Sequence, residues 1–251
     1  MIGIFDSGSG GLTVLKALRE KLPSSNIVYF GDIKNAPYGS KTREELSQLT
    51  IEGMQFLYER GCRSIVSACN SVSASLAISL FDTLAIEPTH LIEMVGPTVS
   101  TFRGASERPL LVATPATILS GIYQNAFRMV GIETQTLPLD GLAGAIEFGK
   151  SNEEIKSIIV NGFKSIDHQS YDIIILACTH YPLVTNLFKE VLGNVPLFDP
   201  ADAVAERALH RFWPREVGEK KLTFCISKDS DTFRKRVATL FPNVQYVVEV
   251  V

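Results

Sequence analysis

Two cysteines of the sequence stand in settings where a thiol could move a proton. Each follows an apolar run and precedes polar residues that can hold a small ligand. The two motifs are Ala68-Cys69-Asn70-Ser71 and Ala177-Cys178-Thr179-His180. A thiol between a strand and a helix meets oriented N–H groups, which can lower its pKa from an unperturbed ~8.5. His180 can serve as the proton partner of Cys178. The sequence therefore predicts acid–base chemistry at both cysteines, beside donors suited to a carboxylate.

Two other chemistries fit the same side chains. Two thiolates and an imidazole can bind zinc, but Cys178 and His180 lie two positions apart on a strand-to-helix turn rather than at finger-like spacing. The pair could also form a redox-active disulfide, although a separated pair facing a cleft favours a molecule held between the sulfurs. Cys62 and Cys225 have no comparable neighbours and are expected to be buried thiols.

A glycine-rich loop follows the first apolar run, with the sequence Asp6-Ser7-Gly8-Ser9-Gly10-Gly11-Leu12. As a dinucleotide fingerprint it is incomplete, because the third glycine of G-x-G-x-x-G would fall at Thr13. Asp32 does resemble the ribose-binding acid of such a fold, so a dinucleotide-dependent oxidoreductase stays an alternative, as does a structural turn. Asp6 argues against the dinucleotide, since a carboxylate would repel a pyrophosphate. We expect the glycines to let the backbone approach a small ligand to which Asp6 and Ser7 present side chains.

Another loop follows the second apolar run, with the sequence Asn35-Ala36-Pro37-Tyr38-Gly39-Ser40. Pro37 and Gly39 fix an unusual path, and Tyr38 can form a wall or lid with a polar tip. Because it lies at the same end of the expected sheet as the other motifs, we expect it to border the same site.

The elements that position these motifs alternate between short apolar runs and helix-length amphipathic segments. The expected strands are Ile2–Phe5, Ile27–Phe30, Ser64–Ser67, Leu110–Ala113, Thr134–Leu137, Ile173–Leu176 and Leu222–Ile226. The expected helices include Lys41–Arg60, Ser71–Leu84, Thr117–Met129 and Asn152–Ile166. This alternation predicts an α/β fold with parallel sheets that helices cover on both faces.

An internal correspondence divides the chain into two similar halves. The run that ends at Cys69 parallels the run that ends at Cys178, an offset of 109 residues, and 3–7 parallels 111–115, an offset of 108. We expect a first half over 1–95, completed by 209–251, and a second half over 96–208, related by pseudo-twofold symmetry. Ligands bind beyond the carboxyl ends of parallel strands, where Asp6, Cys69, Thr114 and Cys178 would lie. The two thiols would then face each other across the cleft between the halves.

The composition is that of a packed globular protein. It is 45% hydrophobic and 20% charged, with a formal net charge of -3, and it has no long block of like charges. Nucleic-acid binding is not expected. No apolar run approaches the ~20 residues of a membrane span, and the first residues lack the features of a signal peptide. We expect a cytoplasmic protein with free thiols.

With these motifs in their order, the sequence resembles the glutamate racemase family of the aspartate/glutamate racemase superfamily over nearly its whole length. The motifs that carry the resemblance are Phe5-Asp6-Ser7-Gly8-x-Gly10-Gly11-Leu12-Thr13-Val14, Pro37-Tyr38-Gly39, Ala68-Cys69-Asn70, Thr114-x-x-Thr117 and Cys178-Thr179-His180-Tyr181-Pro182-Leu183.

The resemblance implies that Cys69 and Cys178 are the catalytic pair, assisted by Asp6 and His180. The ligand contacts that it implies are Ser7, Tyr38, Gly39, Asn70, Ser71, Thr114, Thr117, Glu147 and Thr179. It further implies glutamate as substrate, no pyridoxal phosphate or metal, and a role in making D-glutamate for peptidoglycan. Cys69 would deprotonate the D isomer and Cys178 the L isomer. A homodimer is left open.

Three positions depart from the family pattern. Ser71 replaces a threonine, Ala113 replaces a glycine, and Gly96 stands where a glutamate before proline is usual. These changes bear on substrate preference more than on reaction type. A sister enzyme acting on aspartate or another small amino acid, and a homologue that binds without catalysis, therefore stay as alternatives.

Overall fold

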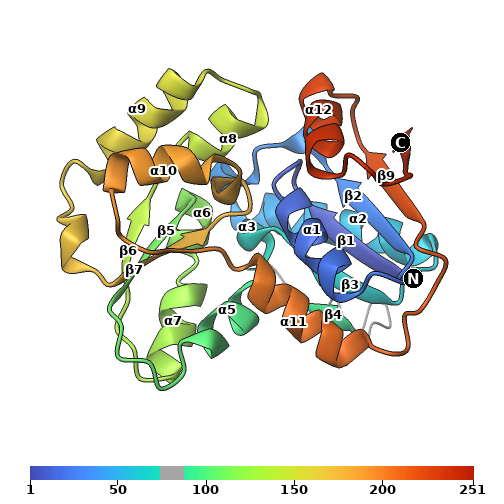
Figure 1. The fold of residues 1–251 in the computed structure, drawn as a ribbon, viewed down its shortest axis with the longest axis horizontal. Helices are drawn as coiled ribbons and strands as arrows, with labels where there is room; N and C mark the ends of the chain where they lie inside the picture. Colours follow the sequence, from blue (N-terminus) through green and yellow to red (C-terminus); the bar gives the residue numbers. More distant parts are fainter. Residues whose placement is uncertain (74–87) are drawn as a thin grey trace.

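Two parallel β-sheets form the framework of the protein (Figure 1). The structure is a computed structural model that describes residues 1–73 and 88–251. The first sheet has the order β10-β9-β2-β1-β3-β4 and the second the order β6-β5-β7-β8. The first sheet comprises β1 (Ile2–Asp6), β2 (Ile27–Gly31), β3 (Ser64–Ser67), β4 (Leu91–Ile92), β9 (Leu222–Ile226) and β10 (Val247–Val250). The second comprises β5 (Pro109–Ala113), β6 (Gln135–Pro138), β7 (Ile173–Ala177) and β8 (Leu197–Phe198). The predicted α/β fold with two parallel sheets is confirmed.

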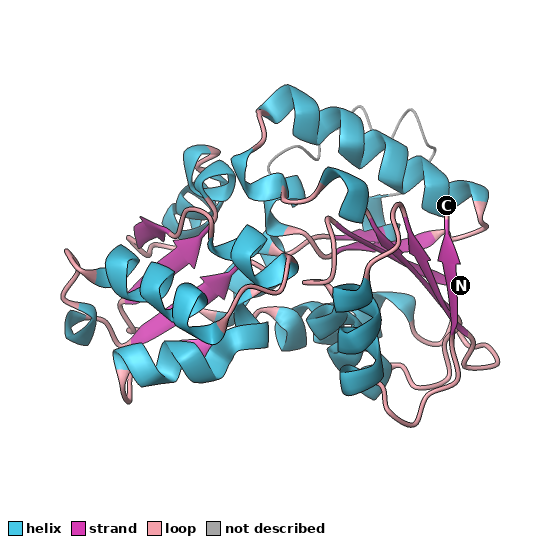
Figure 2. Ribbon diagram, turned by 90° about the horizontal axis from the view of Figure 1, so that it is seen from above, coloured by secondary structure: helices cyan, strands magenta, loops and turns pink. Residues whose placement is uncertain are grey.

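Helices cover both faces of each sheet (Figure 2). Those described are α1 (Leu12–Lys21), α2 (Arg43–Glu59), α3 (Asn70–Ser73), α5 (Val95–Thr101), α6 (Pro115–Leu119), α7 (Ile122–Met129), α8 (Leu142–Glu147), α9 (Asn152–Phe163), α10 (Thr185–Leu192), α11 (Ala201–Phe212) and α12 (Asp231–Leu240). In the first sheet, β1, β2 and β3 are buried along their whole length. Strands covered on both faces need continuous apolar runs, which explains why these segments do not alternate with polar residues.

Several helices begin or end where local sequence dictates. Both α2 and α9 start with capping boxes, formed by Thr42 with Glu45 and by Ser151 with Glu154. The single helix expected over Thr117–Met129 is instead two helices, α6 and α7, because Gly121 adopts a left-handed conformation (φ 68°) between them. Most of the helix expected over Ser71–Leu84 lies outside the described residues.

The chain leaves the first sheet after β4 and returns to it after β8. Strands β9 and β10 lie beside β2, so in Figure 1 the red end of the chain joins the blue beginning. Helix α11 packs against α1 and α5. We call the first sheet with α1, α2, α3, α11 and α12 the first half, and the second sheet with α5 to α10 the second half. The residue bounds expected for the two units stay a prediction.

Strand register places the motifs in two matched pairs. In the first half, Phe5 pairs with Ser67. The carboxyl ends of β1 and β3 therefore bring Asp6 and Cys69 to the same edge of the sheet. In the second half, Ala113 pairs with Ala177, so Thr114 and Cys178 follow neighbouring strand ends. Within the described residues, no helix is long and apolar enough to cross a bilayer.

Candidate active site

The carboxyl ends of both sheets border one small cavity. The lining residues are Ser7, Pro37, Tyr38, Gly39, Cys69, Asn70, Ser71, Thr114, Ala143, Cys178, Thr179 and His180. The centre of a water molecule can occupy only about 10 Å³ of it, so the cavity has room for about one water. The two thiols from opposite halves therefore share a closed space.

Most of the residues expected at the site line this cavity. The other three expected residues lie directly behind its wall. Each of the three contacts a lining residue: Asp6 contacts Thr179, Thr117 contacts Thr114, and Glu147 contacts His180. The sequence motifs thus converge on one place, but Glu147 supports His180 instead of facing the cavity.

Cys69 lies between β3 and α3 and is 4% exposed. Its Sγ lies 3.7 Å from Ser7 Oγ, which is the hydrogen-bond partner of the thiol. Burial, together with the nearby charges of Asp6 and Cys178, raises the pKa of Cys69 to about 12. In the closed cavity, Cys69 therefore rests as a protonated thiol that can donate its proton.

Asp6 joins the two halves beneath the cavity. Its Oδ2 accepts a hydrogen bond from the Gly8 N–H at 3.0 Å, and its Oδ1 accepts one from Thr179 Oγ1 of the other half at 3.1 Å. Burial raises the pKa of this fully buried carboxyl, although the charge of His180 and the N–H groups of Gly11 and Gly8 oppose the shift. A carboxyl with a raised pKa near Cys69 is a candidate for proton exchange with that thiol.

The second thiol has a different neighbour. Cys178 Sγ lies 3.9 Å from His180 Nδ1, and His180 Nε2 lies 2.7 Å from Glu147 Oε2. Burial lowers the pKa of His180, but the hydrogen bonds to Cys178 and Glu147 outweigh this and raise it to about 10. His180 is thus a protonated imidazolium beside Cys178 at neutral pH, and an imidazolium stabilises a neighbouring thiolate.

Glu147 holds that imidazolium from behind. It is 2% exposed, and its Oε2 also accepts hydrogen bonds from Ser9 N at 3.0 Å and Ser9 Oγ at 2.6 Å. Burial raises the pKa of Glu147, but the bonds from His180 and Ser9 outweigh it and lower the pKa to about 2. The carboxylate therefore stays ionised and fixes the ring so that Nδ1 points toward the thiol.

Three hydroxyls from both halves meet on one wall. Ser71 Oγ lies 3.0 Å from Thr114 Oγ1 and 3.3 Å from Thr117 Oγ1, and the two threonine oxygens are 3.0 Å apart. Thr114 also caps the N-terminus of α6. The hydroxyl of Ser71 thus takes part in a cluster in which each member can rotate its proton toward an anion.

Asn70 offers an unused donor. Its Oδ1 accepts a hydrogen bond from Tyr123 OH at 2.6 Å, whereas its Nδ2 has no hydrogen-bond partner among the described residues. Asn70 is 2% exposed, and leaving a buried N–H₂ without a partner is costly unless a ligand completes it. Tyr123, which the sequence did not suggest, orients the amide from the second half.

Tyr38 is fixed by Asp32. Its hydroxyl donates to Asp32 Oδ2 at 2.6 Å, and both carboxylate oxygens of Asp32 also accept hydrogen bonds, from Asn35 and Ser227. The acid that resembled a ribose ligand is therefore engaged in holding the loop. This geometry does not favour the dinucleotide alternative.

Glycines let the loops of one half touch the other. A Cβ at position 10 would lie 2.5 Å from Thr179 Oγ1 and 2.6 Å from His180 Nδ1. A Cβ at position 39 would lie 2.7 Å from Thr114 Cβ. Side chains at Gly10 and Gly39 would hold the halves apart, so the cavity depends on these close approaches.

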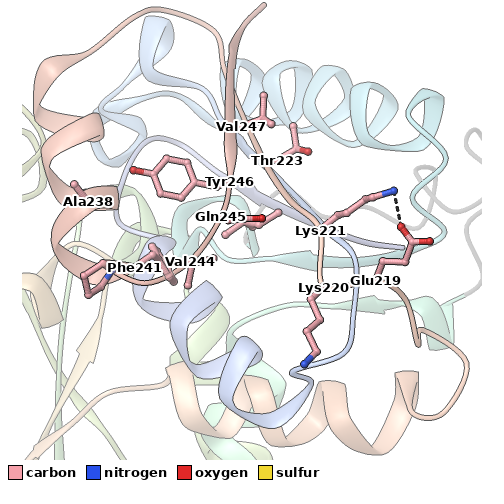
Figure 3. A pocket seen from close by; sticks show the side chains of 12 residues that line it. Glu219, Lys220, Lys221, Thr223, Ala238, Phe241, Val244, Gln245, Tyr246 and Val247 are labelled. Carbon is pink, nitrogen blue, oxygen red and sulfur yellow. Dashed lines mark ion pairs between the residues drawn. The ribbon is translucent and has the colours of Figure 1, made fainter.

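Other features of the surface are separate from this site. Within residues 1–73 and 88–251, no three His, Cys, Asp or Glu side chains are grouped so that they could hold a metal ion. A wide groove of about 820 Å³ lies along β9, β10 and the end of α12, where Lys221 pairs with Glu219 (Figure 3). None of the motif residues borders it.

Two parallel α/β units with a pair of thiols in the cavity between them define the class of protein, and comparison with known proteins agrees. Residues 10–208 match the model of the Asp/Glu/Hydantoin racemase family. The glutamate racemase of Lactobacillus helveticus is 35% identical over 208 residues, which is 82% of this chain and 78% of that protein. The glutamate racemase of a Thermoanaerobacter species is 30% identical over 95% of this chain and 92% of its own length.

A solved structure shows the same fold. The glutamate racemase of Francisella tularensis, in complex with D-glutamate, aligns with a TM-score of 0.87 at 26% identity over 100% of this chain and 96% of its own. The chain belongs to the Asp/Glu/Hydantoin racemase family and is an amino-acid racemase. The resemblance inferred from the motifs is confirmed.

Proposed function

We propose that this chain interconverts L- and D-glutamate by moving one proton between Cα and each of two thiols, Cys69 and Cys178. The observation that carries this proposal is that both thiols, from opposite halves, line one closed cavity. The names of the relatives, glutamate racemases, support glutamate as the substrate.

Inversion at Cα needs a base on one face and an acid on the other. With L-glutamate bound, the Cys178 thiolate takes the Cα proton, and the S–H of Cys69 delivers its proton to the opposite face. Cys178 ends as a thiol and Cys69 as a thiolate, which is the state ready for the D isomer. The pKa of His180, raised to about 10 by its partners against the effect of burial, supports the thiolate at Cys178. Each positioned proton-transfer group contributes roughly 10² to 10⁴-fold.

The cavity supplies neutral donors for the charge that builds on the substrate carboxylate. Asn70 Nδ2 has no partner among the described residues and can donate to the substrate, and the hydroxyls of Ser71, Thr114 and Thr117 can turn toward the same anion. Donors fixed before the reaction stabilise developing charge without reorganisation. These residues, with Ser7, Tyr38, Gly39 and Thr179, are proposed to hold the substrate.

Substrate entry requires the halves to separate, because the closed cavity has room for about one water molecule. We propose that the first half and the second half are the moving bodies, which extends the predicted bounds of 1–95 with 209–251 and 96–208 by letting the whole of α11 move with the first half, because it packs against α1. Closure would exclude water from the carbanion and strengthen each hydrogen bond to it. Through its product, the enzyme would supply D-glutamate for peptidoglycan.

The substrate assignment is tested by following optical rotation or circular dichroism of purified protein with single enantiomers. We expect glutamate to lose its signal in both directions and aspartate, alanine and serine to lose theirs far more slowly. A faster reaction with aspartate would identify the sister activity instead, and no reaction with any of them would refute the proposed function.

A further inference from the structure

Arg236 extends from the first half to the end of α8 in the second half, where Glu147 holds His180 beside Cys178. It lies on α12, and its guanidinium donates to the backbone carbonyl oxygens of Ile146 and Glu147, the latter at 3.3 Å, and to Ser9 Oγ. Its Nη1 also lies 3.5 Å from Glu147 Oε2. The side chain is 18% exposed, so most of this cation is withdrawn from water to make these contacts.

The contacts with α8 have a clear physical basis. The last carbonyl groups of a helix have no partners within the helix, and a cation there interacts favourably with the helix dipole. The planar guanidinium can satisfy both carbonyls and the carboxylate together, which an ammonium on a flexible chain does less well. Arg236 therefore fixes the end of α8 and the Glu147 side chain to the first half.

The partners of Glu147 divide between the two halves. Ser9 and Arg236 come from the first half, and His180 comes from the second. When the halves separate, the carboxylate keeps only His180 of these three, and the end of α8 loses its link to α12. Closure therefore completes the set of contacts around Glu147, the residue that holds His180 beside Cys178.

We propose that Arg236 is a positioning residue, which through Glu147 and His180 readies Cys178 for proton transfer only when the two halves are closed. This role rests on the proposed function. Arg236 itself touches none of the lining thiols and is 90 residues away from Ile146 in the chain.

A loss of rate alone would not separate this role from a structural one. Because the two enantiomers of glutamate have equal free energy, kcat/KM is the same in both directions for every variant. Deuterium isotope effects differ, since Cα-deuterated L-glutamate reports the transfer to Cys178 and Cα-deuterated D-glutamate reports the transfer to Cys69. A change confined to the Cys178 side therefore moves the two isotope effects in opposite directions.

The test compares R236M and R236K with R234M. Arg234 lies on the same helix and pairs with Asp229 at the surface, which makes it a matched control. We expect R236M to lower kcat/KM by roughly 10- to 100-fold, as for a misplaced catalytic group. Its isotope effect should rise with the L isomer and fall toward one with the D isomer. R236K, which keeps the cation, should recover part of the rate, and R234M should match the native protein.

Unchanged kinetics in R236M, or a slower reaction with both isotope effects unaltered, would overturn the role of Arg236. If R236M does not fold, R236K decides by the same two isotope effects. Failure of the proposed function is distinguishable, because the native protein would then not racemise glutamate at all.

Discussion

Replacement of either Cys69 or Cys178 by serine is expected to lower kcat/KM for glutamate racemisation by about 10³-fold or more. Serine fits the space of the thiol, but its hydroxyl is a far weaker acid and its alkoxide is not accessible near neutral pH. Both variants should fail in both directions, because the proposed mechanism uses both groups in each direction. The measurement is the initial rate of loss of circular dichroism from L- and from D-glutamate.

C225S provides the matched control for this substitution. Cys225 is also a buried thiol, but it lies on β9 beside Glu249 and borders no part of the cavity. C225S should keep the native rate in the fraction that folds. If C69S or C178S also racemises glutamate at the native rate, proton transfer by the two thiols is wrong.

Replacement of Asn70 by leucine should cause the next largest loss. Leucine has nearly the same shape but removes the Nδ2 donor that has no partner among the described residues. Loss of one fixed donor to developing negative charge lowers kcat by roughly 10²- to 10³-fold. Y123F keeps that donor and removes only the hydroxyl that orients the amide. It should lower kcat/KM about fivefold, which is the equivalent of one hydrogen bond of about 1 kcal/mol.

Separate measurement of kcat and KM distinguishes this role from simple binding. A rise in KM at constant kcat in N70L would mean that Asn70 binds the substrate and the transition state equally strongly. N161L, on the exposed surface of α9, is the control for the same change of residue and should leave both constants unaltered.

The sequence allowed the sheets and the thiol pair to be predicted because both depend on local patterns. Buried parallel strands need continuous apolar runs, and ligand groups follow their carboxyl ends. The 109-residue offset between Cys69 and Cys178 then related the two halves. The short strands β4 and β8, each of two residues, carry too little pattern to be predicted.

The contacts that support His180 from behind the cavity could not be predicted, and the reason is physical. Glu147, Ser9 and Arg236 meet only because α8, the glycine loop and α12 converge in space, and no spacing in the chain encodes that meeting. Tyr123 lies on α7, where it continues an apolar helix face, and its hydroxyl gave no sign of a partner. Such contacts follow from the packing of elements, not from the sequence of any one element.

The most direct test of the proposed proton transfer is to measure, early in a reaction in heavy water, which enantiomer of glutamate carries deuterium at Cα. In the proposed mechanism with L-glutamate in D₂O, Cys178 removes protium and Cys69 delivers deuterium from the opposite face. The D-glutamate formed first should therefore carry deuterium at Cα, while the L-glutamate that remains should still carry protium. Protium retained in the product, or deuterium gained by unreacted L-glutamate as fast as product forms, would contradict the two-thiol mechanism.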